Sequence, residues 1–164
     1  MELKRKFNFK TCLIAVYVLF AVFYLVIGFL PAEATEYMIS SSLSIPEIEL
    51  SAEVTELELD DEGLETPDKI VGSFSYAENK TLLIGHSTTV FEDLSQVGAG
   101  SVVVYDGREY IVREAKTLAK DRIDMRKVLA EAEVDTIVMM TCAGELFGDG
   151  DATHRLILTA TLAE

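Results

Sequence analysis

The sequence has few of the residues that build disulfides and zinc sites. Its 164 residues include two cysteines and two histidines. Cys12 lies in an apolar run near the N-terminus, so Cys142 has no disulfide partner in the remainder of the chain. The histidines, His86 and His154, do not have the spacing with a cysteine that zinc sites show. The sequence therefore does not support a disulfide-stabilised scaffold or a zinc site.

Basic residues are also scarce. The chain has 14 Lys and Arg residues against 28 Asp and Glu residues, which gives a formal net charge of −14. Four of the basic residues lie at positions 4–10, and the next one along the chain is Lys69. The sequence shows no basic stripe in its main part that would hold a row of phosphates, so nucleic-acid binding is disfavoured.

Residues 11–30 form an uncharged apolar run that predicts a transmembrane helix. At 1.5 Å per residue such a helix spans about 30 Å, the thickness of the hydrocarbon core of a bilayer. Basic residues precede it and acidic residues follow it, so the positive-inside rule places the N-terminus in the cytoplasm. We expect a cytoplasmic basic segment at 1–10, a signal anchor in the cell membrane at 11–30, a stalk or linker at 31–43 and an extracytoplasmic domain at 44–164.

A cleaved signal peptide is the alternative to an anchor, because Ala32-Glu-Ala34 resembles a cleavage site. The apolar run is longer than the core of most signal peptides, which favours the anchor. Both alternatives place the main domain outside the cytoplasm.

The rest of the chain is rich in short β-type runs. Asp106-Gly107 lies between two of them and predicts a hairpin with a type I′ turn. Helical segments are predicted at 91–97 and at 123–132, the second with Asp121 as its N-cap. Because no βαβ alternation is visible, the pattern favours a mostly antiparallel barrel or sandwich. The predicted strands are 44–50, 52–59, 81–85, 101–105, 108–116, 136–140 and 155–162, and 70–76 is ambiguous.

Three residues suited to thiol chemistry stand at the ends of these runs. His86 and Cys142 each follow an apolar run, and Arg155 opens the last one. A thiolate attacks carbonyl carbons, an imidazole can protonate a leaving amine, and a guanidinium can bind an oxyanion. Cys142 and Arg155 flank one loop, so we expect them on neighbouring antiparallel strands, whereas His86 must come from elsewhere in the sheet.

Each of the three residues also has a purely structural interpretation. Cys142 suits a buried core thiol, and His86 suits a hydrogen-bonded strand terminus. Arg155 could pair with the acidic residues of the loop 143–153. His154 is adjacent to Arg155 and should face the opposite side of the strand.

The motifs around these residues resemble the signature segments of the sortase family. These segments are Ile84-Gly-His86, Met140-Thr-Cys142 and Arg155-Leu-Ile-Leu158. The resemblance extends over residues 44–162 and implies a closed β-barrel of about eight strands with one or two short helices. Sortases usually have T-L-x-T-C at the cysteine, and here Val138-Met139 replace Thr-Leu, which leaves the subclass open.

The resemblance also implies an activity and roles for the three residues. Cys142 would be the nucleophile, His86 the proton donor to the leaving group, and Arg155 the residue that binds substrate or stabilises the oxyanion. The implied enzyme is a cysteine transpeptidase that cleaves a C-terminal sorting signal of L-P-x-T-G type through a thioacyl intermediate. The acyl group then passes to an amine of a cell-wall (peptidoglycan) precursor or a pilin.

The implied partners are surface proteins or pilins that carry sorting signals, an amine acceptor and the membrane. No cofactor or metal is expected. Some sortases use calcium, and the acidic stretch 47–68 is a conceivable site, but it does not have EF-hand spacing.

Two other classes compete with this interpretation. A non-catalytic, membrane-anchored β-domain, such as an inactive sortase relative, could bind a peptide or a cell-wall component. A papain-like cysteine hydrolase is disfavoured because its cysteine precedes its histidine, whereas here His86 precedes Cys142.

Overall fold

The computed structural model describes residues 39–59, 66–147 and 151–164. The chain divides into two compact units, 1–36 and 37–164, and all described residues belong to the second. The strands are β1 (Ile39–Ile45), β2 (Leu50–Glu56), β3 (Val71–Ala77), β4 (Lys80–Ile84), β5 (Val102–Tyr105), β6 (Arg108–Ala119), β7 (Thr136–Leu146) and β8 (Ala152–Leu162). The helical segments are η1 (Pro46–Ile48), η2 (Leu94–Gln96), η3 (Lys120–Arg122) and α2 (Met125–Leu129).

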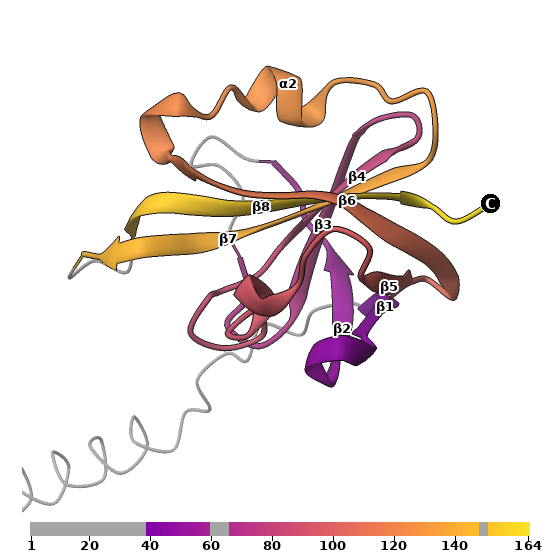
Figure 1. The fold of residues 1–164 in the computed structure, drawn as a ribbon, viewed down its shortest axis with the longest axis horizontal. Coiled ribbons are helices and arrows are strands. Elements are labelled where there is room, and N and C mark those ends of the chain that lie inside the picture. Colours follow the sequence, from indigo (N-terminus) through magenta and orange to yellow (C-terminus); the bar gives the residue numbers. More distant parts are fainter. Residues whose placement is uncertain (1–38, 60–65, 148–150) are drawn as a thin grey trace, which may run out of the picture. The chain divides into compact units, whose positions relative to one another are not determined.

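The eight described strands close into a barrel in the order β1-β2-β3-β4-β7-β8-β6-β5, and β5 pairs with β1 to complete the circle (Figure 1). Most neighbouring strands are antiparallel, but β2 pairs with β3 and β4 pairs with β7 in parallel. This architecture confirms the predicted eight-strand closed barrel with few short helices. Closure leaves no open sheet edge in the described strands.

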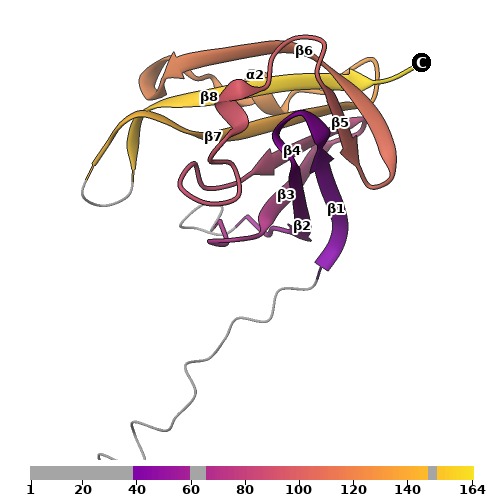
Figure 2. The same ribbon diagram turned by 60° about the horizontal axis from the view of Figure 1, so that its bottom comes forward.

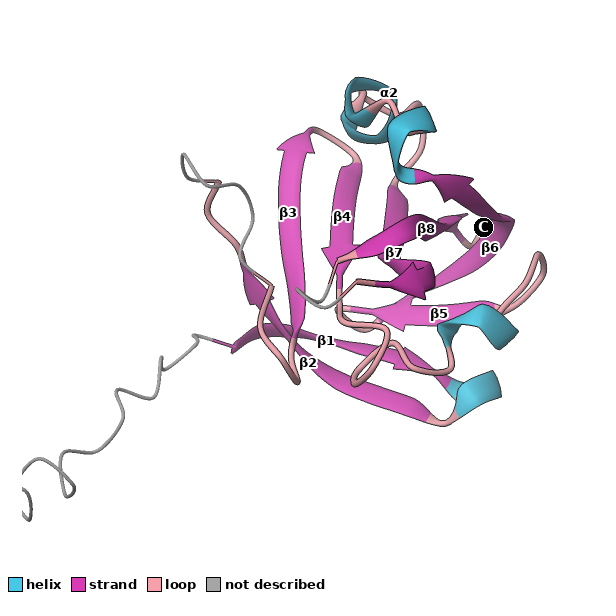
Figure 3. Cartoon of the chain, turned by 90° about the vertical axis from the view of Figure 1, so that its left-hand side faces the viewer, coloured by secondary structure: helices cyan, strands magenta, loops and turns pink. Residues whose placement is uncertain are grey.

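Side chains of the strands alternate between two apolar clusters. All eight strands contribute apolar side chains from their inner faces to the barrel interior. Leu83, Met139 and Leu158 are fully buried there. Their neighbours Leu82, Val138 and Ile157 form a second cluster on the outside, which the β6–β7 connection and α2 cover. Figure 3 shows α2 beside the barrel in this connection. Strands β4, β7 and β8 are therefore apolar on both faces, which explains their continuous apolar runs.

The predicted hairpin is confirmed, and the predicted helix is shorter than expected. Asp106 and Gly107 join β5 to β6 with φ of 49° and 73°, as a type I′ turn requires. The helix α2 has Asp124, not Asp121, as its N-cap, and the Asp124 carboxylate accepts a hydrogen bond from the Arg126 amide at 3.1 Å. Asp121 instead lies in η3, and extended backbone at Ala130 ends the helix.

The first predicted strand, 44–50, is wrong. The strand β1 begins at Ile39, before the predicted domain boundary at 44, and the chain turns at Pro46. Proline fixes φ and cannot donate a ladder hydrogen bond, and Glu49 adopts a left-handed φ of 53°. The run is therefore divided between β1 and β2.

The hairpin of β7 and β8 is longer than the apolar runs that predicted it. Pairing continues past Cys142 to Leu146 opposite Ala152, so Cys142 lies inside a strand and not at its end. Figure 2 shows this ribbon extending beyond the barrel. Backbone hydrogen bonds do not depend on apolar side chains, so the two strands extend beyond the apolar runs of the sequence.

The predicted anchor and most of the predicted stalk lie outside the described residues. In the three described ranges, no helix is long and apolar enough to cross a membrane.

Candidate active site

Cys142 and Arg155 are direct partners across the antiparallel pair of β7 and β8. Residues directly opposite each other in such a pair present their side chains on the same face, within about 5.5 Å at Cβ. This face is the outer one, because Val138 and Ile157 occupy it at positions of the same parity along the two strands. The predicted adjacency of the cysteine and the arginine is therefore present in the fold.

The parallel pairing of β4 with β7 brings the third residue to the same place. Ile84 is level with Met140, so His86 and Cys142 each lie two residues beyond this last paired position of the two strands. Two hydrogen bonds continue the contact between the two chain segments beyond the end of β4. The Gly85 amide donates to the Met140 carbonyl at 3.4 Å, and the buried Thr141 hydroxyl donates to the Gly85 carbonyl at 2.7 Å.

Gly85 allows the chain to turn sharply just before His86. A Cβ atom at Gly85 would lie 2.6 Å from a methyl of Val90 and 2.7 Å from the ring of Phe91, which is fully buried. The Phe91 amide donates to the His86 carbonyl at 3.0 Å and closes the turn. Close packing therefore requires a glycine at position 85, and the turn that this glycine allows positions His86.

The imidazole of His86 contacts the segment that leads into β3. Its Nε2 lies 3.1 Å from the Thr66 carbonyl, and because a carbonyl can only accept, Nε2 carries the proton. The Asp68 carboxylate is 3.9 Å from the same nitrogen and the Thr89 hydroxyl donates to the Asp68 carbonyl, so this segment is tied to the turn after His86. The His86 side chain is 41% exposed, so it can reach a substrate.

Arg155 is held by a set of hydrogen bonds at the base of the β7–β8 ribbon. Its Nη1 donates to the carbonyls of Ala152 and His154 at 3.0 Å, and its Nη2 donates to the Asp151 carboxylate at 2.6 Å. Lys120 donates to the other oxygen of that carboxylate. The Nε–H of Arg155 takes part in none of these bonds and is available for an oxyanion.

The Asp151 carboxylate is shared by two cations. The hydrogen bonds from Lys120 and then from Arg155 hold the pKa of Asp151 well below its usual range. The pairing of Arg155 with an acidic loop residue is therefore real. Arg155 is also the strand partner of Cys142, and these hydrogen bonds fix the orientation of its guanidinium.

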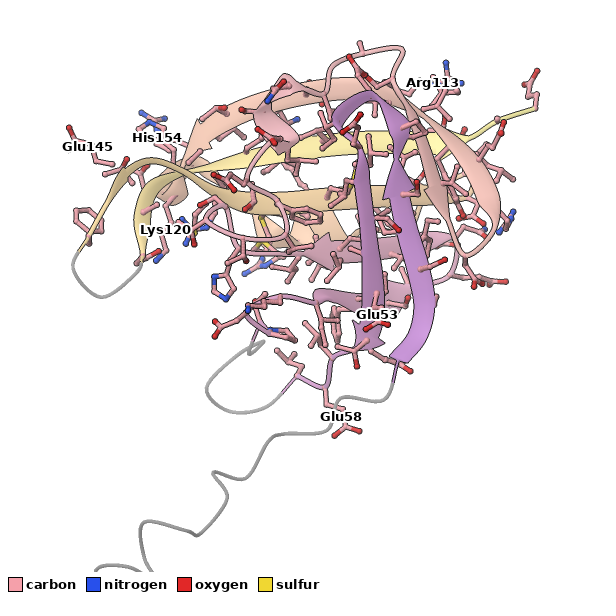
Figure 4. All side chains as sticks on the ribbon, turned by 90° about the horizontal axis from the view of Figure 1, so that it is seen from below. Glu53, Glu58, Arg113, Lys120, Glu145 and His154 are labelled. Atoms are coloured by element: carbon pink, nitrogen blue, oxygen red, sulfur yellow. The ribbon has the colours of Figure 1, made fainter. Side chains whose placement is uncertain are left out.

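The remaining candidates differ in position. Cys142 is a free thiol of intermediate burial. His154 pairs with Ala143 on the opposite face of the ribbon, and its Nδ1 lies 2.7 Å from the Thr153 hydroxyl. Figure 4 shows His154 near Glu145 towards the end of the ribbon. His154 is therefore not part of the cluster of His86, Cys142 and Arg155.

Within the described ranges, no three His, Cys, Asp or Glu side chains are grouped so that they could hold an ion. Part of the acidic stretch that was considered for calcium, residues 60–65, lies outside these ranges.

Sequence reasoning missed two supporting groups, Thr141 and Asp68, and did not single out Asp151 among the acidic loop residues that it offered as partners of Arg155. Thr141 stands in the motif before the cysteine, but its bond to Gly85 depends on which strand is the neighbour. Asp68 reaches His86 only through the path of the β2–β3 connection. Asp151 was visible as an acidic residue four positions before Arg155, yet nothing in the sequence distinguished it from a solvated loop residue.

Comparisons with known proteins agree with this architecture. The lid mutant of sortase A from Corynebacterium diphtheriae has a TM-score of 0.59 with 20% identity, over 82% of this chain and 75% of its own. Sortase A from Listeria monocytogenes has 0.59 with 17% identity, over 77% of this chain and 88% of its own. Sortase C-1 from Actinomyces oris has 0.57 with 21% identity, over 84% of this chain and 78% of its own.

No family model and no curated protein matches the sequence. The likeness to solved structures is one of fold, and the chain has the sortase fold. This confirms the resemblance stated from the motifs.

Proposed function

We propose that the protein is a cysteine transpeptidase of the sortase type. The observation that supports this proposal is the strand register, which pairs Cys142 with Arg155 and ends β4, two residues before His86, beside the part of β7 that leads to Cys142. A thiol, an imidazole and a guanidinium are the groups that acyl transfer through a thioester needs.

The reaction begins when the Cys142 thiolate attacks the carbonyl carbon of a peptide bond. The tetrahedral oxyanion accepts hydrogen bonds from Arg155, whose charge is permanent. As the C–N bond breaks, the His86 imidazolium protonates the leaving amine, and the acyl group remains on sulfur as a thioester. A second amine then attacks the thioester, gives its proton to the neutral His86 and displaces the thiolate.

The substrates follow from the same proposal. The acyl donor is a surface protein or pilin with a C-terminal sorting signal of L-P-x-T-G type, and the acceptor is an amine of a peptidoglycan precursor or a pilin. Residues 11–30 anchor the chain in the cell membrane, with the N-terminus in the cytoplasm and the barrel outside.

The decisive test is capture of the thioester. Full-length protein in a non-ionic detergent is incubated with a peptide containing Leu-Pro-Ala-Thr-Gly, and intact-mass spectrometry measures acyl attachment to Cys142. We expect an adduct in the unaltered chain and none in Cys142→Ala, because alanine has no nucleophile. An adduct of the same size in Cys142→Ala would overturn the proposal.

The role of His86 is tested in the same assay. His86→Ala should slow acyl-enzyme formation by about 10²–10⁴-fold, the usual contribution of general acid catalysis. His154→Ala is the matched control, because this histidine lies on the opposite face, and it should retain normal rates. If His86→Ala reacts as fast as His154→Ala, another group protonates the leaving amine.

A further inference from the structure

A hollow of about 220 Å³ lies on the outer face of the barrel, between the strands and the β6–β7 connection. Its floor is apolar and includes Val138 of β7 and Ile157 of β8, both nearly fully buried. Ile123 and Val128 of the β6–β7 connection form an apolar wall. This volume suits one or two side chains of a peptide and is too small for a folded partner.

The rim of the hollow carries a concentration of positive charge. Lys80, Lys116, Arg122 and Lys127 all line it. This grouping is unusual in a chain with 14 basic residues and a formal net charge of −14. Among the described residues that line the hollow, Asp124 is acidic, and its carboxylate caps α2.

Most of these cations have no ion-pair partner in the part of the chain that the structure describes. Lys116 pairs with Glu114 at 2.8 Å, whereas Lys80, Arg122 and Lys127 form no salt bridge there. Other cations of the barrel do find carboxylates, as Arg108 does with Asp135. Like charges that converge without local neutralisation favour an anionic ligand.

The hollow is in line with the candidate active site. Val138 precedes Cys142 by four residues on the same strand and the same face, and Ile157 lies two residues beyond Arg155. At about 3.3 Å per residue, Val138 is roughly 13 Å from Cys142 along the strand. An extended peptide covers this distance with about four residues, so one bound chain can occupy both places.

We propose that this hollow, with Lys80, Arg122 and Lys127 at its rim, selects peptide substrates that carry acidic side chains about four to six residues before the reacting bond. The proposal rests on the proposed function, since it identifies the substrate class of that enzyme. The apolar floor takes an aliphatic side chain, and the cations bind the carboxylates beside it. A peptide fits better than a lipid surface, because the charges surround a concave apolar site.

The experiment compares two peptides that differ only in charge. One contains Asp-Asp-Leu-Pro-Ala-Thr-Gly and the other Asn-Asn-Leu-Pro-Ala-Thr-Gly, and kcat/KM for acyl transfer is measured with the full-length chain in a non-ionic detergent. We expect a preference of about five-fold for the acidic peptide, because exposed ion pairs are individually weak. Raising the salt concentration should reduce this preference through screening.

Single substitutions test whether the cations at the rim of the hollow cause the preference for the acidic peptide. Arg122→Gln and Lys127→Gln should each lower kcat/KM for the acidic peptide more than for the Asn-Asn peptide and so reduce the preference. Arg126→Gln is the control, because Arg126 is exposed on α2 next to Lys127 but does not line the hollow. A preference that survives Arg122→Gln and Lys127→Gln, or that falls equally in Arg126→Gln, would contradict the proposal.

A binding assay separates failure of this inference from failure of the proposed function. Fluorescence polarisation measures the affinity of both labelled peptides for Cys142→Ala. If Cys142→Ala binds the acidic peptide selectively but the unaltered chain turns over neither peptide, the inference stands and the proposed transpeptidase activity is overturned. Turnover of both peptides at equal rates, or binding of neither, would overturn the inference. Binding of anionic phosphatidylglycerol vesicles that is lost in Lys127→Gln, without any peptide preference, would assign the rim to a lipid surface and overturn it too.

Discussion

At the scale of single residues, the carboxylate of Asp151 connects two cations from different parts of the chain. It accepts hydrogen bonds from Lys120, at the end of β6, and from Arg155 on β8. Both bonds stabilise the ionised carboxyl, so its pKa in the folded protein lies below that in the unfolded chain. This ion pair therefore stabilises the fold at neutral pH and fixes the guanidinium of the residue that pairs with Cys142.

The sign of this pKa shift predicts a pH dependence. A carboxyl with a lowered pKa adds its full stability above its unfolded pKa, near 3.9, and this contribution is lost progressively as the pH falls from that value towards the lower pKa of the folded state. Asp151→Asn should therefore lower the melting temperature by a few degrees at pH 7 and by less at pH 2, as circular dichroism can measure. Asp121→Asn, an exposed change nearby, should have no such dependence. Equal effects of Asp151→Asn at both pH values would rule out this linkage.

At the scale of elements, the end of β4 depends on close packing of Gly85 against the turn that follows. Gly85→Ala would push a methyl group into Val90 and Phe91, and Phe91 belongs to the barrel core. Overpacking of this kind costs about 1–3 kcal/mol. We expect a clear loss of thermal stability and a displaced His86, seen as slower acyl-enzyme formation.

Gly98→Ala is the matched control for this prediction. A Cβ at Gly98 meets nothing within 4 Å, so the change should leave the melting temperature unchanged or slightly higher. If Gly85→Ala is as stable as Gly98→Ala, the neighbouring side chains can move aside and the glycine does not define the turn.

At the scale of the whole molecule, the proposed topology places the barrel outside the cell and residues 1–10 inside. A membrane-impermeant maleimide added to intact bacteria that express the full chain should label Cys142, a free thiol of intermediate burial. Cys142→Ala should remain unlabelled, since Cys12 lies in the apolar run of the proposed anchor. Labelling of Cys142 only after cell lysis would contradict the topology.

Part of the barrel could be predicted from local patterns. The run before His86, the run before Cys142 and the turn at Asp106-Gly107 each have a signal within a few residues, and each element is present. The boundaries at Ile39 and Leu146 could not be predicted, because strands continue wherever a neighbour offers backbone partners.

The sequence by itself determined the residue types of the candidate site and the adjacency of Cys142 and Arg155, because one hairpin joins them. Only the tertiary structure decided how His86 reaches them, through the parallel pairing of β4 with β7. It also decided that Lys80 meets Arg122 and Lys127 at one hollow. The physical reason is that local propensity acts over a few residues, whereas strand order depends on how the whole barrel closes and buries its two apolar clusters.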